Sequence, residues 1–322
     1  MSVEPTNPVG AVIDLGSNAV RLLIARALPG GRAQVLAEDR ELTFFLQAVS
    51  PEGELLRDKA QPTALAVESF SQKARAAGAE FVCLIATAAG RKLQEPQATL
   101  ERLLAASNGL PKVLSPEEEA RLGFLGATYG LPASAERLCV IDIGGVSTEV
   151  SFGSPGNPRT QRSLPLGSQS ATARFVTEDP VSRLEYRAFL AELRASLPRF
   201  LSGIPRTRLE GLGAGGAFTT LAAMALELPS FDKEAVCRIQ LSLHKVQVLR
   251  RKLQQLPVEE RRNLPGLEPE RAHMMWAGAV IAEELMKELR LTRVALPRYG
   301  LRMGAFLAYC LPELGFSPPT SG

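Results

Sequence analysis

Two short stretches of the chain carry the same residue types in the same order. AVIDLGSN (residues 11–18) and CVIDIGGVS (139–147) each run from an apolar strand into Asp, an aliphatic residue, Gly and small polar residues. Glycine lets backbone N–H groups approach a ligand, hydroxyls donate hydrogen bonds, and a carboxylate can hold a metal ion directly or through water. A single turn of this kind would be an ordinary hairpin turn. Two at matching places favour binding of phosphate groups with a metal ion.

The elements around the two turns follow the same order in both halves of the chain. The hydrophobic pattern predicts three consecutive strands at the start of each half, at 10–15, 20–27, 33–40, 138–144, 148–153 and 160–166. Alternating helices and strands follow in each half, with extra helices inserted in the second. Ligands of open α/β sheets bind at strand ends, so two such units facing each other would place both turns at one central cleft.

The composition is that of a globular protein long enough for two domains, with 322 residues of which 45% are apolar and 22% charged. Its 37 basic and 34 acidic residues give a net charge of only +3, so we expect no nucleic-acid partner. The four cysteines are far apart without a Cys-x-x-Cys pair, which argues against a disulfide framework and a zinc site.

The sequence shows no signal peptide and no uncharged apolar run approaching the ~20 residues of a membrane span. We therefore expect a cytoplasmic protein without a membrane partner. Residues 1–8 and 316–322 are expected to be disordered tails.

Three adjacent glutamates, Glu117, Glu118 and Glu119, are candidates for a catalytic carboxylate at the start of a predicted helix. Ser115 suits the N-cap and Pro116 the first helical position. Glu118 follows three residues after the cap, where its side chain can return a hydrogen bond to the cap N–H in a capping box.

The helical period separates the other two glutamates. At ~100° per residue, Glu119 lies on the stripe of Leu122, Gly123 and Gly126, whereas Glu117 points almost directly away. The small glycines on this stripe predict close packing, so Glu119 is expected to point inward.

Eight motifs in chain order resemble the exopolyphosphatase and guanosine pentaphosphate phosphohydrolase family, which belongs to the actin, sugar-kinase and heat-shock ATPase superfold. They are IDLGSNAVRLLIA (13–25), ATAAGRK (86–92), SPEEEARLGFLGA (115–127), IDIGGVSTEVSFG (141–153), SLPLGS (163–168), GAGGAFTTLAA (213–223), RAHMMWAGAVI (271–281) and GLRMG (300–304). Each motif is weak alone, but the ordered set spans about residues 10 to 310 and is specific.

The resemblance implies roles for individual residues, including Glu119 as the base that activates the attacking water. A divalent cation, Mg²⁺ or a substitute, would be held by Asp142 and Glu149, with Asp14 as a further metal candidate. Phosphate groups would be bound by Ser17, Asn18, Arg91, Gly144, Gly145, Ser147, Thr148, Gly213, Gly215 and Gly216. Arg21 would line the first turn, with its role left open.

Some of these positions also have ordinary interpretations. Without the resemblance, Glu149 could equally be a strand residue that faces water, and the glycine-rich turn at 213–216 could serve only helix–strand packing. His244 and His273 are single histidines in helical stretches and are interpreted as structural.

The chain departs from the family pattern at several positions. Val146 stands where the family usually has a third glycine, so the second turn must take a different shape or bear strain. His273 replaces a common Asp and Met303 a common Glu, while ELTFFLQA (41–48) lacks an expected basic, glycine-containing sequence. These departures leave substrate preference and turnover open.

We predict an α/β protein with two ribonuclease H-like domains of the actin-like ATPase superfold. Domain I is expected at 1–123 plus 303–322, with a last helix (303–318) packing back on it, and domain II at 124–302. The predicted function is metal-dependent hydrolysis of terminal phosphoanhydride bonds in inorganic polyphosphate, guanosine pentaphosphate or both. The alternatives are a kinase or ATPase of the same superfold, and a sensor that binds guanosine polyphosphates with weakened catalysis. A homodimer is compatible with the sequence.

Overall fold

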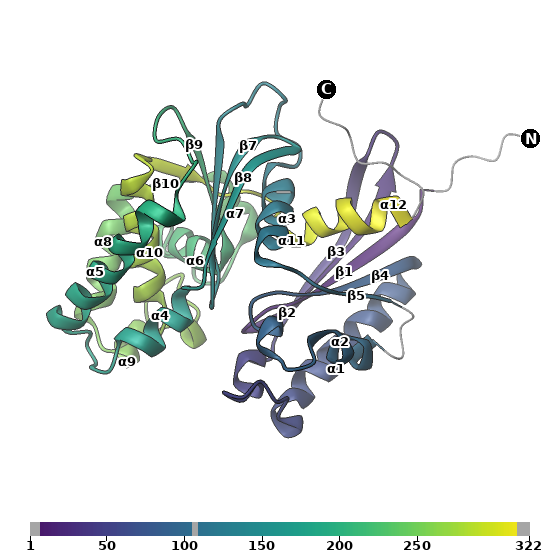
Figure 1. The fold of residues 1–322 in the computed structure, drawn as a ribbon, viewed down its shortest axis with the longest axis horizontal. Coiled ribbons are helices and arrows are strands. Elements are labelled where there is room, and N and C mark those ends of the chain that lie inside the picture. The colour runs from purple at the N-terminus through teal and green to yellow at the C-terminus, as the bar shows by residue number, and fades with distance from the viewer. Residues whose placement is uncertain (1–6, 105–108, 314–322) are drawn as a thin grey trace, which may run out of the picture. The chain divides into compact units, whose positions relative to one another are not determined.

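The computed structural model describes residues 7–104 and 109–313 (Figure 1). Most of the predicted tails, and parts of the predicted helices at 97–109 and 303–318, lie outside these residues. Among the described helices, none has both the length and the apolar content needed to cross a membrane.

The chain divides into two compact units. Unit 1 contains the described residues up to Tyr129 together with those from Leu301 on, and unit 2 runs from Gly130 to Gly300. The first division was predicted after residue 123, whereas helix α3 (Pro116–Thr128) continues past that point. Each unit has its own sheet and its own hydrophobic core, so the predicted two-domain α/β fold is confirmed.

Unit 1 is built on a five-stranded sheet in the order β3-β2-β1-β4-β5. Its strands are β1 (Val9–Leu15), β2 (Ala19–Leu28), β3 (Arg32–Leu42), β4 (Ala79–Ala86) and β5 (Leu110–Val113). The first three strands are antiparallel neighbours, and β4 and β5 extend the sheet in parallel to β1. This is the ribonuclease H-like order. Every residue of β1 is buried, as expected for a central strand covered on both faces.

Helices cover both faces of this sheet (Figure 1). They are α1 (Arg57–Ala76), α2 (Pro96–Leu104), α3, and a C-terminal run of α11 (Leu301–Ala305), a π-helical turn (Phe306–Cys310) and α12 (Leu311–Glu313), with 3-10 turns at Phe45–Ala48 and Gly90–Lys92. The predicted start of the first helix was wrong. The helix was predicted to begin at Pro62, but α1 begins five residues earlier and includes Pro62.

Unit 2 has a six-stranded sheet in the order β10-β11-β9-β6-β7-β8. Its strands are β6 (Leu138–Ile143), β7 (Thr148–Ser154), β8 (Asn157–Leu164), β9 (Glu210–Ala214), β10 (Gln240–Ser242) and β11 (Arg293–Ala295). The first three again form an antiparallel meander, and β9 and β11 continue it in parallel. Strand β10 was not predicted, because three residues are too few to show a period of two.

The core of unit 2 is organised around α10 (Met275–Glu288), whose residues from Met275 to Met286 are all buried. The other helices are α4 (Ser168–Phe175), α5 (Arg183–Phe200), α6 (Gly215–Ala225), α7 (Lys233–Arg238), α8 (Leu243–Gln255) and α9 (Val258–Arg261), with a 3-10 turn at Pro269–Arg271. Helices α4, α5, α6 and α8 all contact α10.

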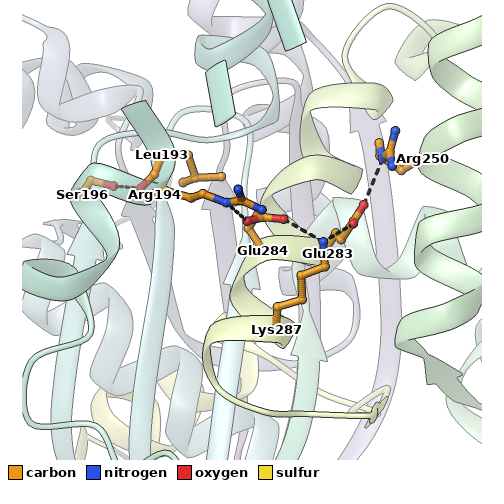
Figure 2. Close-up of polar contacts among 7 residues, drawn as sticks. All are labelled: Leu193, Arg194, Ser196, Arg250, Glu283, Glu284 and Lys287. Carbon is orange, nitrogen blue, oxygen red and sulfur yellow. Dashed lines mark hydrogen bonds and ion pairs between the residues drawn. The ribbon is translucent and has the colours of Figure 1, made fainter. Parts of the chain in front are cut away.

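Two buried carboxylates on α10 join it to α5 and α8 through charged partners (Figure 2). Glu284 accepts hydrogen bonds from Arg194 on α5, at 2.6 Å, and from Lys287, at 3.0 Å. Glu283 accepts one from Arg250 on α8, at 2.9 Å, and another from Lys287. Burying a charge is costly unless it is paired. The network therefore holds three helices in register, because each carboxylate must keep its partner.

We predict that Glu283→Ala lowers the free energy of unfolding by about 3–5 kcal/mol near neutral pH, because it leaves the buried Arg250 without this carboxylate. Glu192→Ala, which breaks an exposed pair with Arg174, should cost at most about 1 kcal/mol. Urea denaturation measures both. Equal costs for the two variants would contradict a structural role for the network.

The same network predicts a pH dependence. Burial raises the pKa of Glu283, but hydrogen bonds from Lys287 and Arg250 outweigh it, so the pKa is lowered overall from 4.5. A carboxyl with a lowered pKa in the folded state stabilises the fold above its unfolded pKa, and this stability is lost as the pH falls through the folded value. The difference between wild type and Glu283→Ala should therefore shrink below about pH 4.5.

Candidate active site

The first Asp-x-Gly turn, between β1 and β2, is held by backbone hydrogen bonds from another segment. The carbonyl of Ser17 accepts from the N–H of Leu46 at 2.9 Å, and that of Asn18 accepts from Thr43 and Phe44 at 3.0 and 3.1 Å. In a planar trans peptide the C=O and N–H point in opposite directions, so fixing the carbonyls fixes where the amides point. Ser17 and Asn18 are both half-buried.

Phe44 holds a left-handed backbone conformation, with φ 49° and ψ 41°. A bulky residue there is an outlier that costs of order 1–3 kcal/mol and persists only where its surroundings impose it. Phe44 lies in the 41–48 segment that lacks the glycine-containing sequence expected from the family. Its N–H bonds the carbonyl of Asn18. This brace could not be predicted from the sequence, since aromatic residues are not expected at positive φ.

Asp14 is buried beside Arg21, its direct cross-strand partner, with 3.7 Å between Oδ2 and Nη1. Burial raises the pKa of Asp14, while the guanidinium groups of Arg21 and Arg302 oppose this shift. Its Oδ1 has no hydrogen-bond partner among the described residues. A buried carboxylate oxygen without a donor suits a cation or a metal-bound water, so Asp14 stays a predicted metal residue.

The helix that carries the three glutamates begins as predicted. Ser115 caps α3, and its hydroxyl accepts a hydrogen bond from the N–H of Glu118 at 3.1 Å. The expected capping box was wrong, because the carboxylate of Glu118 instead accepts a hydrogen bond from the hydroxyl of Tyr309. Tyr309 lies 191 residues away in the chain and could not be inferred from local spacing.

Glu119 and Arg91 form an ion pair at the start of α3. One nitrogen of Arg91, Nη1, donates to Glu119 Oε2 at 2.7 Å and to the carbonyl of Leu114 at 2.8 Å. The Glu119 side chain is 13% exposed, whereas Glu117 is exposed to solvent. The predicted inward orientation of Glu119 is therefore confirmed. Two predicted site residues from separate motifs are brought together here.

The second Asp-x-Gly turn, between β6 and β7, is held by the start of α4. The N–H of Ser168 donates to the carbonyl of Gly144 at 2.9 Å, and that of Ser170 to the carbonyl of Gly145 at 3.0 Å. The Ser170 hydroxyl donates to the carbonyl of Val146 at 3.1 Å. As in the first turn, the carbonyls are bound inside the protein, which sets the direction of the amides.

Gly167 allows this contact between the turn and α4. A Cβ at Gly167 would lie 2.6 Å from the backbone carbon of Gly145 and 2.7 Å from the nitrogen of Val146. Any larger residue would push α4 away from the turn. Gly167, Ser168 and Ser170 belong to or border the SLPLGS motif, to which the sequence analysis gave no individual roles.

The expectation of possible strain at Val146 is not met. Positive φ among described non-glycine residues occurs at Phe44, Arg208, Glu227 and Arg290, so Val146 does not hold a left-handed conformation. The turn takes a shape that suits a β-branched residue, and Val146 is packed with 8% of its surface exposed. Valine here is a packing residue.

Asp142 and Glu149 lie directly opposite each other on β6 and β7. Opposed residues of an antiparallel pair share a face, and this face is opposite to that of the core residues Ile141 and Val150. Glu149 is buried and accepts a hydrogen bond from Ser163 at 2.8 Å, so it does not simply face water. Two like charges opposite each other repel, and a cation would remove this repulsion.

A metal at this place would have few protein ligands. Within the described residues there is no group of three or more His, Cys, Asp or Glu side chains arranged for a metal. Mg²⁺ is commonly bound by one or two carboxylates together with waters and substrate phosphates. Asp142 and Glu149 fit this pattern, and a site of the zinc type is not supported.

Two glycines at the start of α6, Gly215 and Gly216, lie close to charged side chains, and Gly215 lies against the carboxylate of Asp142. A Cβ at Gly215, where φ is +80°, would lie 2.3 Å from Asp142 Oδ1. A Cβ at Gly216 would lie 2.3 Å from Nη1 of Arg271. Arg271 is buried, and its Nε donates to Glu268 at 2.7 Å. Arg271 belongs to the RAHMMWAGAVI motif, but its position beside this turn was not predicted.

Three predicted phosphate residues of unit 2 are buried in other contacts. The hydroxyl of Thr148 donates to the carbonyl of Leu166 at 2.7 Å. The carbonyl of Ser147 accepts from the N–H of Gly144 at 3.0 Å. A Cβ at Gly213 would lie 2.7 Å from the Phe218 ring, so packing accounts for this glycine, the alternative considered from the sequence. Their roles in phosphate binding stay predictions.

The two side chains that depart from the family pattern differ in their surroundings. His273 is exposed in the turn before α10, while Met303 is buried in α11 with 1% of its surface exposed. An apolar side chain suits the buried position of Met303.

Two ribonuclease H-like units that each carry an Asp-x-Gly turn between their first two strands are the fold that the sequence resemblance implied. The sequence profile described as the Ppx/GppA phosphatase family matches residues 23–312. The chain belongs to this family, which confirms the resemblance and the predicted class of phosphatase.

Individual relatives agree with this assignment. The protein named Exopolyphosphatase 1 of Mycobacterium leprae is 28% identical over 302 residues, covering 92% of this chain and 88% of the relative. A Photobacterium profundum protein named guanosine-5'-triphosphate,3'-diphosphate pyrophosphatase is 26% identical, covering 94% of this chain and 60% of the relative. The solved Aquifex aeolicus PPX-GPPA enzyme is 28% identical with a TM-score of 0.82, covering 94% of this chain and 99% of that one.

The unstrained turn gives a prediction for Val146. We expect Val146→Gly to lower the free energy of unfolding by about 2–3 kcal/mol, since it removes a buried side chain and frees the unfolded backbone. Val146→Ala removes most of the same side chain without freeing the backbone, so it should remain more stable than the glycine variant. Urea denaturation measures the free energy of unfolding of both variants. A glycine variant more stable than the alanine variant would show that the valine backbone is strained after all.

Proposed function

We propose that this chain hydrolyses terminal phosphoanhydride bonds and releases orthophosphate from inorganic polyphosphate, guanosine pentaphosphate or both. The observation that carries the proposal is the Arg91–Glu119 pair, a guanidinium and a carboxylate fixed together at the start of a capped helix. The names of the relatives support these two substrate classes.

Hydrolysis of a phosphoanhydride depends on positioning and charge neutralisation more than on covalent catalysis. In the proposed reaction, Glu119 orients the attacking water and accepts its proton. Arg91 holds Glu119 in place through one nitrogen and is suited to contact phosphate oxygens with the rest of its planar guanidinium. Amides of the two Asp-x-Gly turns donate hydrogen bonds to phosphate groups.

The residues proposed to hold a divalent cation are Asp142 and Glu149, with Asp14 as a further candidate. Mg²⁺ bound there would offset the charge of the phosphoryl oxygens during transfer. The hydrogen bond from Ser163 fixes Glu149, and the glycine at 215 leaves room for the carboxylate of Asp142.

Two alternatives are less well supported. A kinase or ATPase of the superfold would need ATP and, for the kinase, an acceptor molecule, whereas family membership points to phosphatases. A guanosine polyphosphate sensor with weakened catalysis was suggested partly by Val146, and the absence of backbone strain there removes one argument for it. A phosphate-release panel with polyphosphates of several lengths, guanosine pentaphosphate, ATP and ADP separates the three.

The metal proposal predicts that a chelator abolishes phosphate release and that added Mg²⁺ restores it. Asp142→Ala should lose at least about a hundredfold in turnover because it removes a cation ligand, while its circular dichroism and melting curve stay those of a folded protein. Release at an undiminished rate in excess chelator would refute the metal assignment.

The base proposal predicts that Glu119→Gln lowers turnover by about 10²–10⁴ while substrate binding and folding are kept. Glu117→Gln is the matched control, since this neighbouring glutamate is exposed, and it should be nearly silent. Steady-state kinetics and equilibrium polyphosphate binding measure these effects. An inactive Glu118→Gln beside a fully active Glu119→Gln would mean that the base has been assigned to the wrong glutamate.

A further inference from the structure

The C-terminal helical run of unit 1 meets helix α3 with backbone-to-backbone packing. A Cβ at Gly304 would lie 1.8 Å from the carbonyl oxygen of Leu122 and 3.1 Å from the nitrogen of Gly126. The stripe of α3 that was predicted to pack closely therefore faces α11. The close approach therefore requires glycine at position 304.

A second contact joins the same two segments one turn further on. The hydroxyl of Tyr309, in the π-helical turn, donates a hydrogen bond to Glu118 Oε1. Lys112 Nζ lies 5.2 Å from the centre of the Tyr309 ring. Burial raises the pKa of Tyr309, and the bond to Glu118 raises it further, so the hydroxyl remains a donor at neutral pH.

The π-helical turn explains how the C-terminal helical run can contact α3 both through Gly304 and through Tyr309. Gly304 and Tyr309 are five residues apart, and in an α-helix such residues point about 140° away from each other. A π-helical turn joins residues five apart and brings them toward the same side. Single π turns are frequent at functional sites. Here the turn directs Tyr309 to the first turn of α3, where the proposed base is located.

We propose that Tyr309 is a positioning residue, which acts through Glu118 to hold the first turn of α3 and so the direction of the Glu119 carboxylate. The inference rests on the proposed role of Glu119. The start of a helix has amides without helical partners, and helix ends fray. Ser115 satisfies one of these amides, and Tyr309 adds an anchor from outside the helix. Glu119 then approaches Arg91 from a fixed backbone.

The test compares two tyrosine variants at opposite ends of α3. Tyr309→Phe removes only the hydroxyl, and we expect it to lower kcat about five- to twentyfold with KM within about twofold, since misdirecting a catalytic group costs rate more than binding. Tyr129→Phe is the control, because its hydroxyl also makes a partly buried hydrogen bond, accepting from the N–H of Ala33 at 2.6 Å, but at the far end of the helix. It should leave kcat and KM unchanged. Melting curves verify that both variants fold.

Variants of Glu118 test whether the effect passes through this residue. Glu118→Gln keeps an acceptor oxygen for Tyr309 and should retain kcat within about twofold, whereas Glu118→Ala should lose as much as Tyr309→Phe. Combining Glu118→Ala with Tyr309→Phe should lower kcat no further, because both remove the same contact.

The outcomes separate this inference from the proposed function. If Glu119→Gln is inactive while Tyr309→Phe has wild-type kcat, the positioning role is overturned and the base assignment stands. If the losses of Glu118→Ala and Tyr309→Phe multiply in the double variant, Tyr309 does not act through Glu118 and the inference is likewise overturned. A fully active Glu119→Gln would remove the base assignment and, with it, the basis of the positioning role.

Discussion

Each Asp-x-Gly turn depends on the same constraint, that its carbonyl oxygens are bound by other residues of its own unit. A turn can present its amides to phosphate only if its carbonyls point elsewhere, since the two groups of a peptide are opposed. Each unit satisfies this constraint differently. In unit 1 a strained segment at Phe44 supplies the donors, and in unit 2 the first turn of α4 supplies them. The start of α4 supplies donors without backbone strain, because the first N–H groups of a helix have no partner within the helix.

Features set by neighbouring residues could be predicted from the sequence. The repeated order of strands and helices, the Ser115 cap and the inward direction of Glu119 all depend on spacings of a few residues, which periodicity reports directly. The Asp142–Glu149 pair also follows from a short hairpin, in which seven positions fix which side chains are opposed. In each case the residues that cause the feature lie within the same short segment of the chain.

Features set by distant segments could not be predicted. Tyr309 reaches Glu118 over 191 residues, and Arg271 lies beside Gly216 because of how α6 and the turn before α10 pack. At Val146 the sequence left two alternatives open, a different turn shape or backbone strain, and the structure shows the first, since a missing glycine causes strain only if the backbone keeps the same path. The local sequence determines which backbone conformations are low in energy, and the tertiary contacts determine which of them is adopted.

The three glutamates at the start of α3 show how a helix gives identical side chains different chemistry. Successive residues are turned by ~100°, so one faces solvent, one faces the π-helical turn and one faces Arg91. Chemical type therefore does not distinguish Glu118 from Glu119, but their partners do. A tyrosine hydroxyl binds Glu118 as a neutral donor, whereas a guanidinium binds Glu119 as a charged one. A helix held at both faces of its first turn can thus use one carboxylate as the proposed anchor and leave its neighbour as the proposed base.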